Sequence, residues 1–171
     1  AGNKPATASL AGMIAAYVAG AMLSGLIIQD STLQLGRRYG VVLTIEALML
    51  FAAIPLFRQE HLSGPLLAAT ACGLQNAMAT TYSGAVIRTS HLSGMFTDLG
   101  ITLGHAVRGM PLGRRRLALC VLIIGFFFVG GLLGAWMFER FDYGALYLPA
   151  VLTGCTGLGY GVYRHMRPPV A

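Results

Sequence analysis

The chain has 171 residues, of which 56% are hydrophobic and only 11% are charged. Soluble domains usually carry about 25% charged residues, so this composition argues against a soluble globular protein, and disorder is excluded more firmly. Twelve Lys and Arg against six Asp and Glu give a net charge of +6. The basic residues lie mostly between apolar runs, where the positive-inside rule places them, so we expect no nucleic-acid partner.

The chain begins with Ala1-Gly2-Asn3 and has no initiator methionine, so we expect a trimmed product that lacks an N-terminal part of the full protein. Its first apolar run, Leu10 to Ile28, is longer than the core of about 7–15 residues of a signal peptide. We therefore interpret this run as a membrane span.

Five apolar runs are long enough, or nearly so, to cross about 30 Å of hydrocarbon as α-helices. A sixth run, Leu92–Val107, is shorter and contains Asp98 and His105. The connections are short and polar, so we predict one transmembrane domain over residues 1–171, an all-α polytopic helix bundle with five or six spans. The five stronger runs are Thr7–Ile28, Gly40–Phe57, Pro65–Thr81, Leu117–Phe138 and Ala145–Tyr163.

Lys and Arg are distributed unevenly between the two sides of either topology. With five or with six spans, the positive-inside rule places Arg114-Arg115-Arg116 and the C-terminus in the cytoplasm. Residues 17–25 and 127–135 also resemble each other, since each stretch has an aromatic residue followed by small residues. We interpret this either as an internal repeat, as in many transporters, or as shared membrane composition.

Small residues recur every four positions in the first run, at Gly12, Ala16, Gly20 and Ser24. Such a stripe lets another helix approach closely. Internal helix packing is the first interpretation, and the seam of a homo-oligomer is the second. The same spacing returns at Gly130/Gly134, Gly131/Ala135 and Gly157/Gly161.

Glu46 lies near the middle of the second run, between Ile45 and Ala47. A charge at the centre of a span costs about 2.5–3.5 kcal/mol on insertion scales, so such a residue is a functional candidate. Three interpretations remain open for Glu46: structural pairing with an arginine, a role in carrying a proton or cation, and a misplaced span boundary.

The densest polar cluster begins with Gln75 and Asn76 inside the third apolar run. Its second part is rich in hydroxyl groups and glycines, which permit a broken or re-entrant helix whose backbone faces a cavity. These side chains predict either a solute-binding site or hydrogen bonds between helices. The second part contains Arg88, Thr89, Ser90, His91, Ser93, Thr97 and Asp98.

If Leu92–Val107 is helical, Asp98, Thr102 and His105 share one face, with His91 seven residues before Asp98. Seven residues rise about 10.5 Å, so His91 and Asp98 cannot ligate one metal from a continuous helix, and we expect no metal site. Asp98 and His91 are candidates for proton relay. Asp98 could instead form a structural ion pair with Arg88.

Motifs for catalysis and cofactor binding are missing. The chain has no GxSxG elbow, no HExxH and no phosphate-binding glycine loop, so we predict that it is not an enzyme and that it binds no cofactor. Cys72, Cys120 and Cys155 lie inside apolar runs without CxxC spacing. We expect them to be buried small hydrophobic residues.

The stretch Gly73-Leu74-Gln75-Asn76-Ala77, followed by the run from Arg88 to Gly100, resembles the YoaK-like family of small multi-pass bacterial membrane proteins of unknown function. The close match covers about 28 residues. The resemblance implies an inner-membrane protein and a transport role, and it implies an additional N-terminal part that this chain lacks. It supplies no substrate.

Two functional hypotheses follow. The first is a transporter or channel for an unknown small solute, in which Gln75, Asn76, Thr89 and Thr97 bind the solute, and Arg88 attracts an anionic group or neutralises Asp98. Asp98, with His91 or Glu46, would couple protons. The second is a non-transporting assembly or regulatory protein in the lipid bilayer, built on its small-residue faces as a homo-oligomer.

Overall fold

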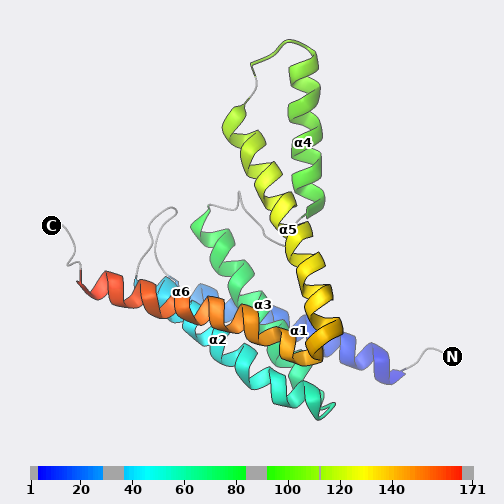
Figure 1. Cartoon of the computed structure of the whole chain (residues 1–171), viewed down its shortest axis with the longest axis vertical. Helices are drawn as coiled ribbons and strands as arrows, with labels where there is room; N and C mark the ends of the chain where they lie inside the picture. Colours follow the sequence, from blue (N-terminus) through cyan, green and yellow to red (C-terminus); the bar gives the residue numbers. More distant parts are fainter. Residues whose placement is uncertain (1–3, 29–36, 84–91, 112, 167–171) are drawn as a thin grey trace. The chain divides into compact units, whose positions relative to one another are not determined.

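The computed structural model describes residues 4–28, 37–83, 92–111 and 113–166. Over these residues the protein is all-α, as the apolar runs predict (Figure 1). The helices are α1 (Lys4–Ile27), α2 (Arg37–Arg58), α3 (Ser63–Tyr82), α4 (Leu92–Val107), α5 (Arg114–Phe141) and α6 (Tyr147–Met166), with a short 3-10 helix, η1 (Asp142–Leu146), between the last two.

Several helices extend beyond the apolar runs that predict them. α2 begins and ends at an arginine, and α5 begins with the triple arginine. Arginine is a good helix former with a long side chain, so it can continue a helix past the apolar segment. Apolar runs therefore mark the centre of each helix better than its ends.

Within the described residues, three segments are long and apolar enough to cross a membrane: Thr7–Ile27, Arg38–Arg58 and Arg114–Tyr163. The third covers 50 residues and includes α5, η1 and most of α6. α3 and α4 are helical at the predicted positions, but they are not among these segments, because α3 contains carboxamides and hydroxyls and α4 is only 16 residues long. The protein is thus helical and compatible with membrane insertion.

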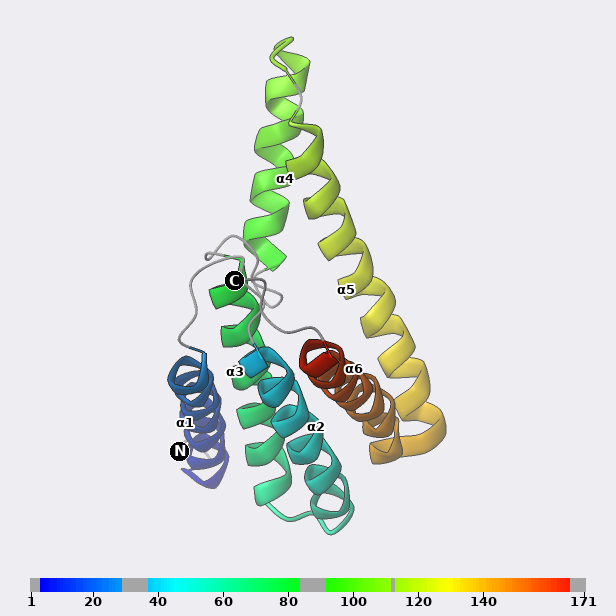
Figure 2. The same ribbon diagram turned by 90° about the vertical axis from the view of Figure 1, so that its left-hand side faces the viewer.

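The chain divides into two compact units. The first contains α1, α2, α3, η1 and α6, and the second contains α4 and α5 up to Arg140. In the first unit the helices lie side by side in the order α1, α3, α2, α6 (Figure 2). Helices that are distant in the sequence therefore pack together: α1 packs on α3, and α2 packs on α6.

Glycines make the closest helix contacts of the first unit. A Cβ atom on Gly20 of α1 would overlap the carbonyl oxygen of Thr70 in α3, and one on Gly73 would overlap the carbonyl oxygen of Tyr17. Between α2 and α6, a Cβ atom on Gly157 would lie 2.9 Å from the backbone nitrogen of Thr44. The small-residue stripe of the first run thus serves internal packing, as its first interpretation holds.

Aromatic contacts join η1 and the start of α6 to the second half of α2. Phe57 stacks on Tyr143 of η1 with ring centroids 4.8 Å apart, and Phe51 contacts Tyr147 at 6.0 Å. α2 itself ends where Glu60 takes a positive φ of 53°, and the His61 amide donates to the carbonyl of Leu56. This left-handed cap stops the helix at the turn into α3.

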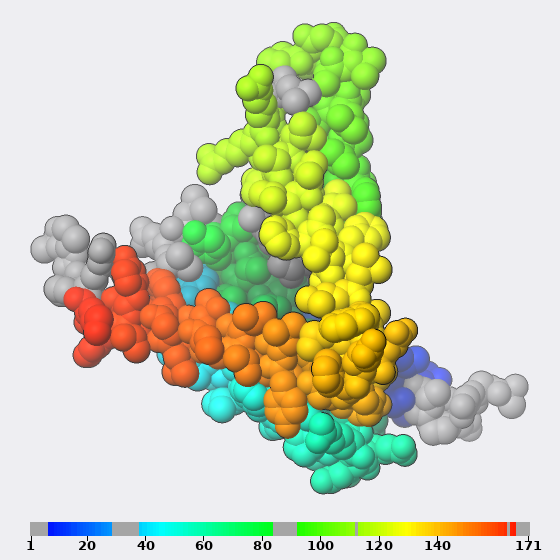
Figure 3. Space-filling model, in the orientation of Figure 1, coloured from blue at the N-terminus to red at the C-terminus, as the bar shows by residue number. Residues whose placement is uncertain are grey.

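In the second unit, α4 ends at Val107, and Gly109 follows with a φ of 73°, which suits glycine, before α5 begins. Phe96 of α4 and Phe128 of α5 meet edge to face at 6.5 Å. Most of the large apolar side chains of α5 are exposed, including Phe126 at 74% and Leu132 at 73%. Figure 3 shows α5 coloured from yellow-green through yellow to orange.

α3 is continuous through Gln75 and Asn76, so the described part of this helix is not broken at the carboxamides. The segment between α3 and α4, where the sequence predicts an interrupted helix, lies outside the described residues. The internal repeat and the number of spans stay predictions.

Candidate functional site

The predicted site residues fall into three groups. Glu46, Gln75 and Asn76 belong to the first unit, and Thr97 and Asp98 belong to the second. The remaining three, Arg88, Thr89 and His91, lie outside the described residues.

Glu46 is buried inside the first unit. Its side chain is only 4% exposed, and its Oε2 atom has no hydrogen-bond partner among the described residues. It lies eight residues after Arg38, about 12 Å along a candidate span of 21 residues. A carboxyl group is therefore held near the middle of an apolar helix with one oxygen unsatisfied, which costs free energy unless a proton or ligand satisfies it.

Helix register places polar residues of two other helices at the level of Glu46. α2 and α3 are antiparallel, since Tyr39 contacts Tyr82 and Leu50 packs with Ala71, which brings Gln75 to this level. On the other side of α2, the Cβ of Ala47 lies 3.3 Å from the position of a Cβ on Gly154. This contact brings the neighbouring half-buried residue Thr153 to the same level.

The α3 side of this level carries a cysteine as well. Cys72 is close enough to Glu46 for an electrostatic interaction between the two groups. Cys72 is exposed, and Gln75, one turn further along α3, is exposed too. α3 contains no Asp, Glu, Lys, Arg or His, so none of its side chains can pair ionically with Glu46.

Asn76 connects two helices. Its Nδ2 atom donates a hydrogen bond to the hydroxyl of Tyr17 in α1, next to the Gly73 crossing. Thr80, one turn later, donates to the carbonyl of Asn76. This geometry is that of an interhelical hydrogen bond in a membrane bundle, the second of the two roles that the sequence predicts for the cluster.

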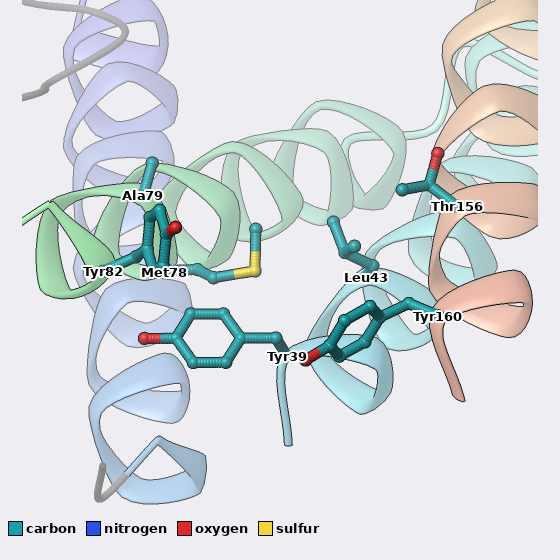
Figure 4. A pocket seen from close by; sticks show the side chains of 7 residues that line it. All are labelled: Tyr39, Leu43, Met78, Ala79, Tyr82, Thr156 and Tyr160. Atoms are coloured by element: carbon teal, nitrogen blue, oxygen red, sulfur yellow. The ribbon is translucent and has the colours of Figure 1, made fainter. Parts of the chain in front are cut away.

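A pocket of about 340 Å³ opens between α2, α3 and α6 (Figure 4). α2 contributes Tyr39 and Leu43, and the Met78 side chain extends from α3 toward the middle of the pocket. The lining is apolar and rich in aromatic rings, and it consists of Tyr39, Leu43, Met78, Ala79, Tyr82, Thr156 and Tyr160.

Asp98, in contrast to Glu46, is paired. Arg116 at the start of α5 donates from Nη2 to Asp98 Oδ1 at 2.8 Å, and the Arg116 side chain is 62% exposed. The predicted alternative partner, Arg88, lies outside the described residues. Thr102 donates to the backbone carbonyl of Asp98, which confirms that the two residues are one turn apart on a helix.

The other polar groups of α4 are occupied locally or point outward. Thr97 is exposed and donates to the carbonyl of Ser93 one turn earlier. Thr102 is buried, whereas His105 is exposed, so the predicted polar face of α4 is only partly covered. No group of three His, Cys, Asp or Glu is positioned to hold a metal ion within the described ranges.

The prediction for the cysteines holds for Cys120, which is buried, and is wrong for Cys72 and Cys155, which are exposed. An apolar run can present a small residue on its outer side as easily as on its inner side. All three thiols are free.

Sequence reasoning missed the tyrosines. Tyr17, Tyr39, Tyr82 and Tyr160 come from four different helices, so only the register of the helices brings them near the site. One signal was present: Tyr39-Gly40 and Gly159-Tyr160-Gly161 place an aromatic ring beside glycines inside apolar runs. Gly40 is indeed a contact point, because a Cβ there would lie 2.9 Å from the carbonyl oxygen of Gly157.

Comparisons with known proteins give a family and no activity. A search of curated proteins found no significant match, and neither did a search of solved structures. The family model DUF1275, described as a protein of unknown function, matches residues 1–159. The chain therefore belongs to DUF1275.

Proposed function

We propose that the protein is a membrane transporter or channel for a small solute, and that Glu46 is its proton- or cation-carrying group. The observation that supports this most is the burial of Glu46 in a candidate span with Oε2 unsatisfied among the described residues. A carboxyl group in that position costs free energy, and intramembrane carboxylates commonly mark ion pathways and proton relays. A purely structural role would instead call for a partner.

Gln75 and Thr153 support a solute site at the same level. They lie on the two helices that flank α2, and each can both donate and accept a hydrogen bond. A small polar solute bound beside Glu46 could exchange its hydration shell for these groups.

Asp98 receives a structural role in this proposal. Its carboxylate forms an ion pair with Arg116, which links α4 to the start of α5. We therefore assign the coupling of protons to Glu46 and not to Asp98. Asn76 stabilises the contact between α1 and α3 through its hydrogen bond to Tyr17.

For the location of the protein, we infer a bacterial inner membrane with a cytoplasmic C-terminus. Support comes from the YoaK-like motif and from the excess of Lys and Arg on one side of either topology. The triple arginine that begins α5 would then be cytoplasmic.

A second function has an observation of its own in its favour. The glycines of α5 at 125, 130, 131 and 134 have nothing within 4 Å of a Cβ position, and the apolar side chains around them are exposed. A non-transporting assembly protein would use this surface to pack against another membrane helix.

Proton-linked flux in proteoliposomes tests the first function. Purified protein is reconstituted with a pH-sensitive dye inside, and a panel of small anions, cations, amino acids and sugars is added outside. We expect at least one solute to drive a saturable pH change with the wild-type protein and none with Glu46→Gln. Glu60→Gln is the matched control, because Glu60 lies beyond the end of α2.

Glu60→Gln is expected to behave like the wild-type protein. A solute-driven pH change that persists in Glu46→Gln would refute the coupling role. No flux of any solute, measured also with radiolabelled compounds to detect electroneutral transport, would favour the assembly function.

A further inference from the structure

The lining of the pocket between α2, α3 and α6 restricts the chemical class of ligand that it can bind. It is lined by three tyrosine rings and by Leu43, Met78 and Ala79, so it favours an apolar body. Its volume of about 340 Å³ is at the lower end of the range of ligand pockets, about 300–1,000 Å³, which limits the ligand to a compact molecule.

The tyrosines also provide a surface for positive charge. A cation within about 6 Å of an aromatic ring centroid is attracted by the ring face. Tyr39 and Tyr82 meet edge to face at 5.8 Å on one side of the pocket, and Tyr160 enters from α6 on the other (Figure 4). A cationic group between these sides would meet rings of more than one helix.

Glu46 lies about one helical turn from a residue that lines the pocket. Leu43 lines the pocket, and Glu46 follows it by three residues on the same side of α2. In the same way Gln75 lies three residues before Met78 on α3, and Thr153 lies three residues before Thr156 on α6. These three polar residues are not among those that line the pocket, and each lies about one helical turn from one that does.

On the three helices that line the pocket, no basic side chain lies at the level of Glu46. The lysines and arginines of α2 and α6 are confined to the helix ends, and α3 has none. The titratable groups that α3 and α6 bring to the level of Glu46 are Cys72 and Cys155, and neither is cationic. The Glu46 carboxylate would repel an anionic ligand here and attract a cationic one.

We propose that the tyrosine-lined pocket and Glu46 form a binding site for a compact organic cation with an apolar body. The apolar part occupies the space among Tyr39, Tyr82 and Tyr160, and the ammonium group lies toward Glu46. This inference rests on the proposed function and specifies its substrate class. Protonation of Glu46 would release the cation, because the neutral acid no longer attracts it.

Binding of benzyltrimethylammonium tests the proposal, because this cation keeps its charge at every pH. Isothermal titration calorimetry on the full chain in nanodiscs compares it with phenylmethanesulfonate, an anion of similar size. We expect saturable binding of the cation only. Glu46→Gln is expected to weaken it at least tenfold, and binding to the wild-type protein is expected to weaken as pH falls.

A second pair of variants keeps the test independent of Glu46. Tyr160→Leu removes an aromatic face and keeps an apolar side chain, whereas Tyr160→Phe keeps the face. Loss of a cation–π contact is expected to weaken binding about tenfold in Tyr160→Leu and to leave Tyr160→Phe near the wild-type affinity.

The outcomes separate the two proposals. Equal binding of cation and anion, or no binding of either, would overturn the cation site. If another solute drives Glu46-dependent flux while benzyltrimethylammonium does not bind, the result supports the transport function and contradicts an organic cation as its substrate. If the cation binds as expected but is not moved across the membrane, the site stands and the transport function falls.

Discussion

The two units use the same kinds of residue in opposite ways. In the first unit, Gly20 and Gly73 lie where α1 and α3 cross so closely that a methyl group would overlap the backbone of the other helix. In α5 of the second unit, Gly130 and Gly134 have the same spacing but open space around them. A small-residue pattern therefore predicts that a helix can be approached closely, and not which helix approaches it.

The acidic residues differ in a parallel manner. Glu46 in the first unit is buried with one oxygen unsatisfied among the described residues, and Asp98 in the second is partly exposed and paired with Arg116. Charge inside an apolar helix is thus a cost in the first unit and part of a stabilising contact in the second. This contrast is what directs the functional proposal to Glu46.

The largest expected effect is that of filling a glycine crossing. Gly73→Ala should lower the free energy of unfolding by about 3 kcal/mol, because the new Cβ meets rigid backbone that cannot move without separating α1 from α3. Gly134→Ala is the matched change in α5 and should cause no destabilisation. Thermal unfolding of both variants in the same detergent makes the comparison, and equal destabilisation of the two would contradict it.

Replacing the two acids should change stability in opposite directions. Glu46→Met removes an unsatisfied buried carboxyl and keeps its volume, so we expect it to raise the free energy of unfolding by about 1–2 kcal/mol while transport is lost. Chemical denaturation of Glu46→Met beside the wild-type protein measures this. A clear loss of stability would show that Glu46 has a stabilising partner and would favour its structural role.

The hydrogen bond between Tyr17 and Asn76 should contribute less. Tyr17→Phe keeps the ring and removes the acceptor, and polar contacts between membrane helices contribute about 0.6–1.7 kcal/mol. The control is Tyr147→Phe, since Tyr147 is exposed and its ring contact with Phe51 needs no hydroxyl. Indistinguishable unfolding midpoints for the two variants would show that the bond contributes nothing.

The ion pair of the second unit should give the smallest effect. Asp98→Asn removes the pair with Arg116, which is 62% exposed, so we expect a loss of about 0.2–1 kcal/mol that shrinks as salt screens the charges. Unfolding midpoints at low and high ionic strength measure this. Loss of proton-linked flux in a folded Asp98→Asn protein would contradict its structural role and return the coupling function to Asp98.

Much of the fold could be predicted from local patterns. The apolar runs locate the helices, and the spacing of Asp98 and Thr102 correctly predicts a shared helix face, because both depend only on neighbours in the sequence. The central position of Glu46 in its helix is also a local property.

The features that could not be predicted from the sequence depend on contacts between distant segments. The pair between Asp98 and Arg116 could not be predicted, because it is set by how α5 lies beside α4. The tyrosine-lined pocket requires the register of three helices, which no single run reveals. Exposure of Cys72 depends on which side of α3 faces its neighbours.

Water access to Glu46 can be measured with a native reporter. Cys72 interacts electrostatically with Glu46, so a variant with Cys120→Ser and Cys155→Ser leaves one thiol beside the site. In sealed proteoliposomes we predict that Cys72 reacts with a membrane-impermeant methanethiosulfonate, and that the reaction slows when a bound solute fills the site. Reaction with membrane-permeant N-ethylmaleimide alone would place Glu46 beside lipid and contradict a solute pathway through the first unit.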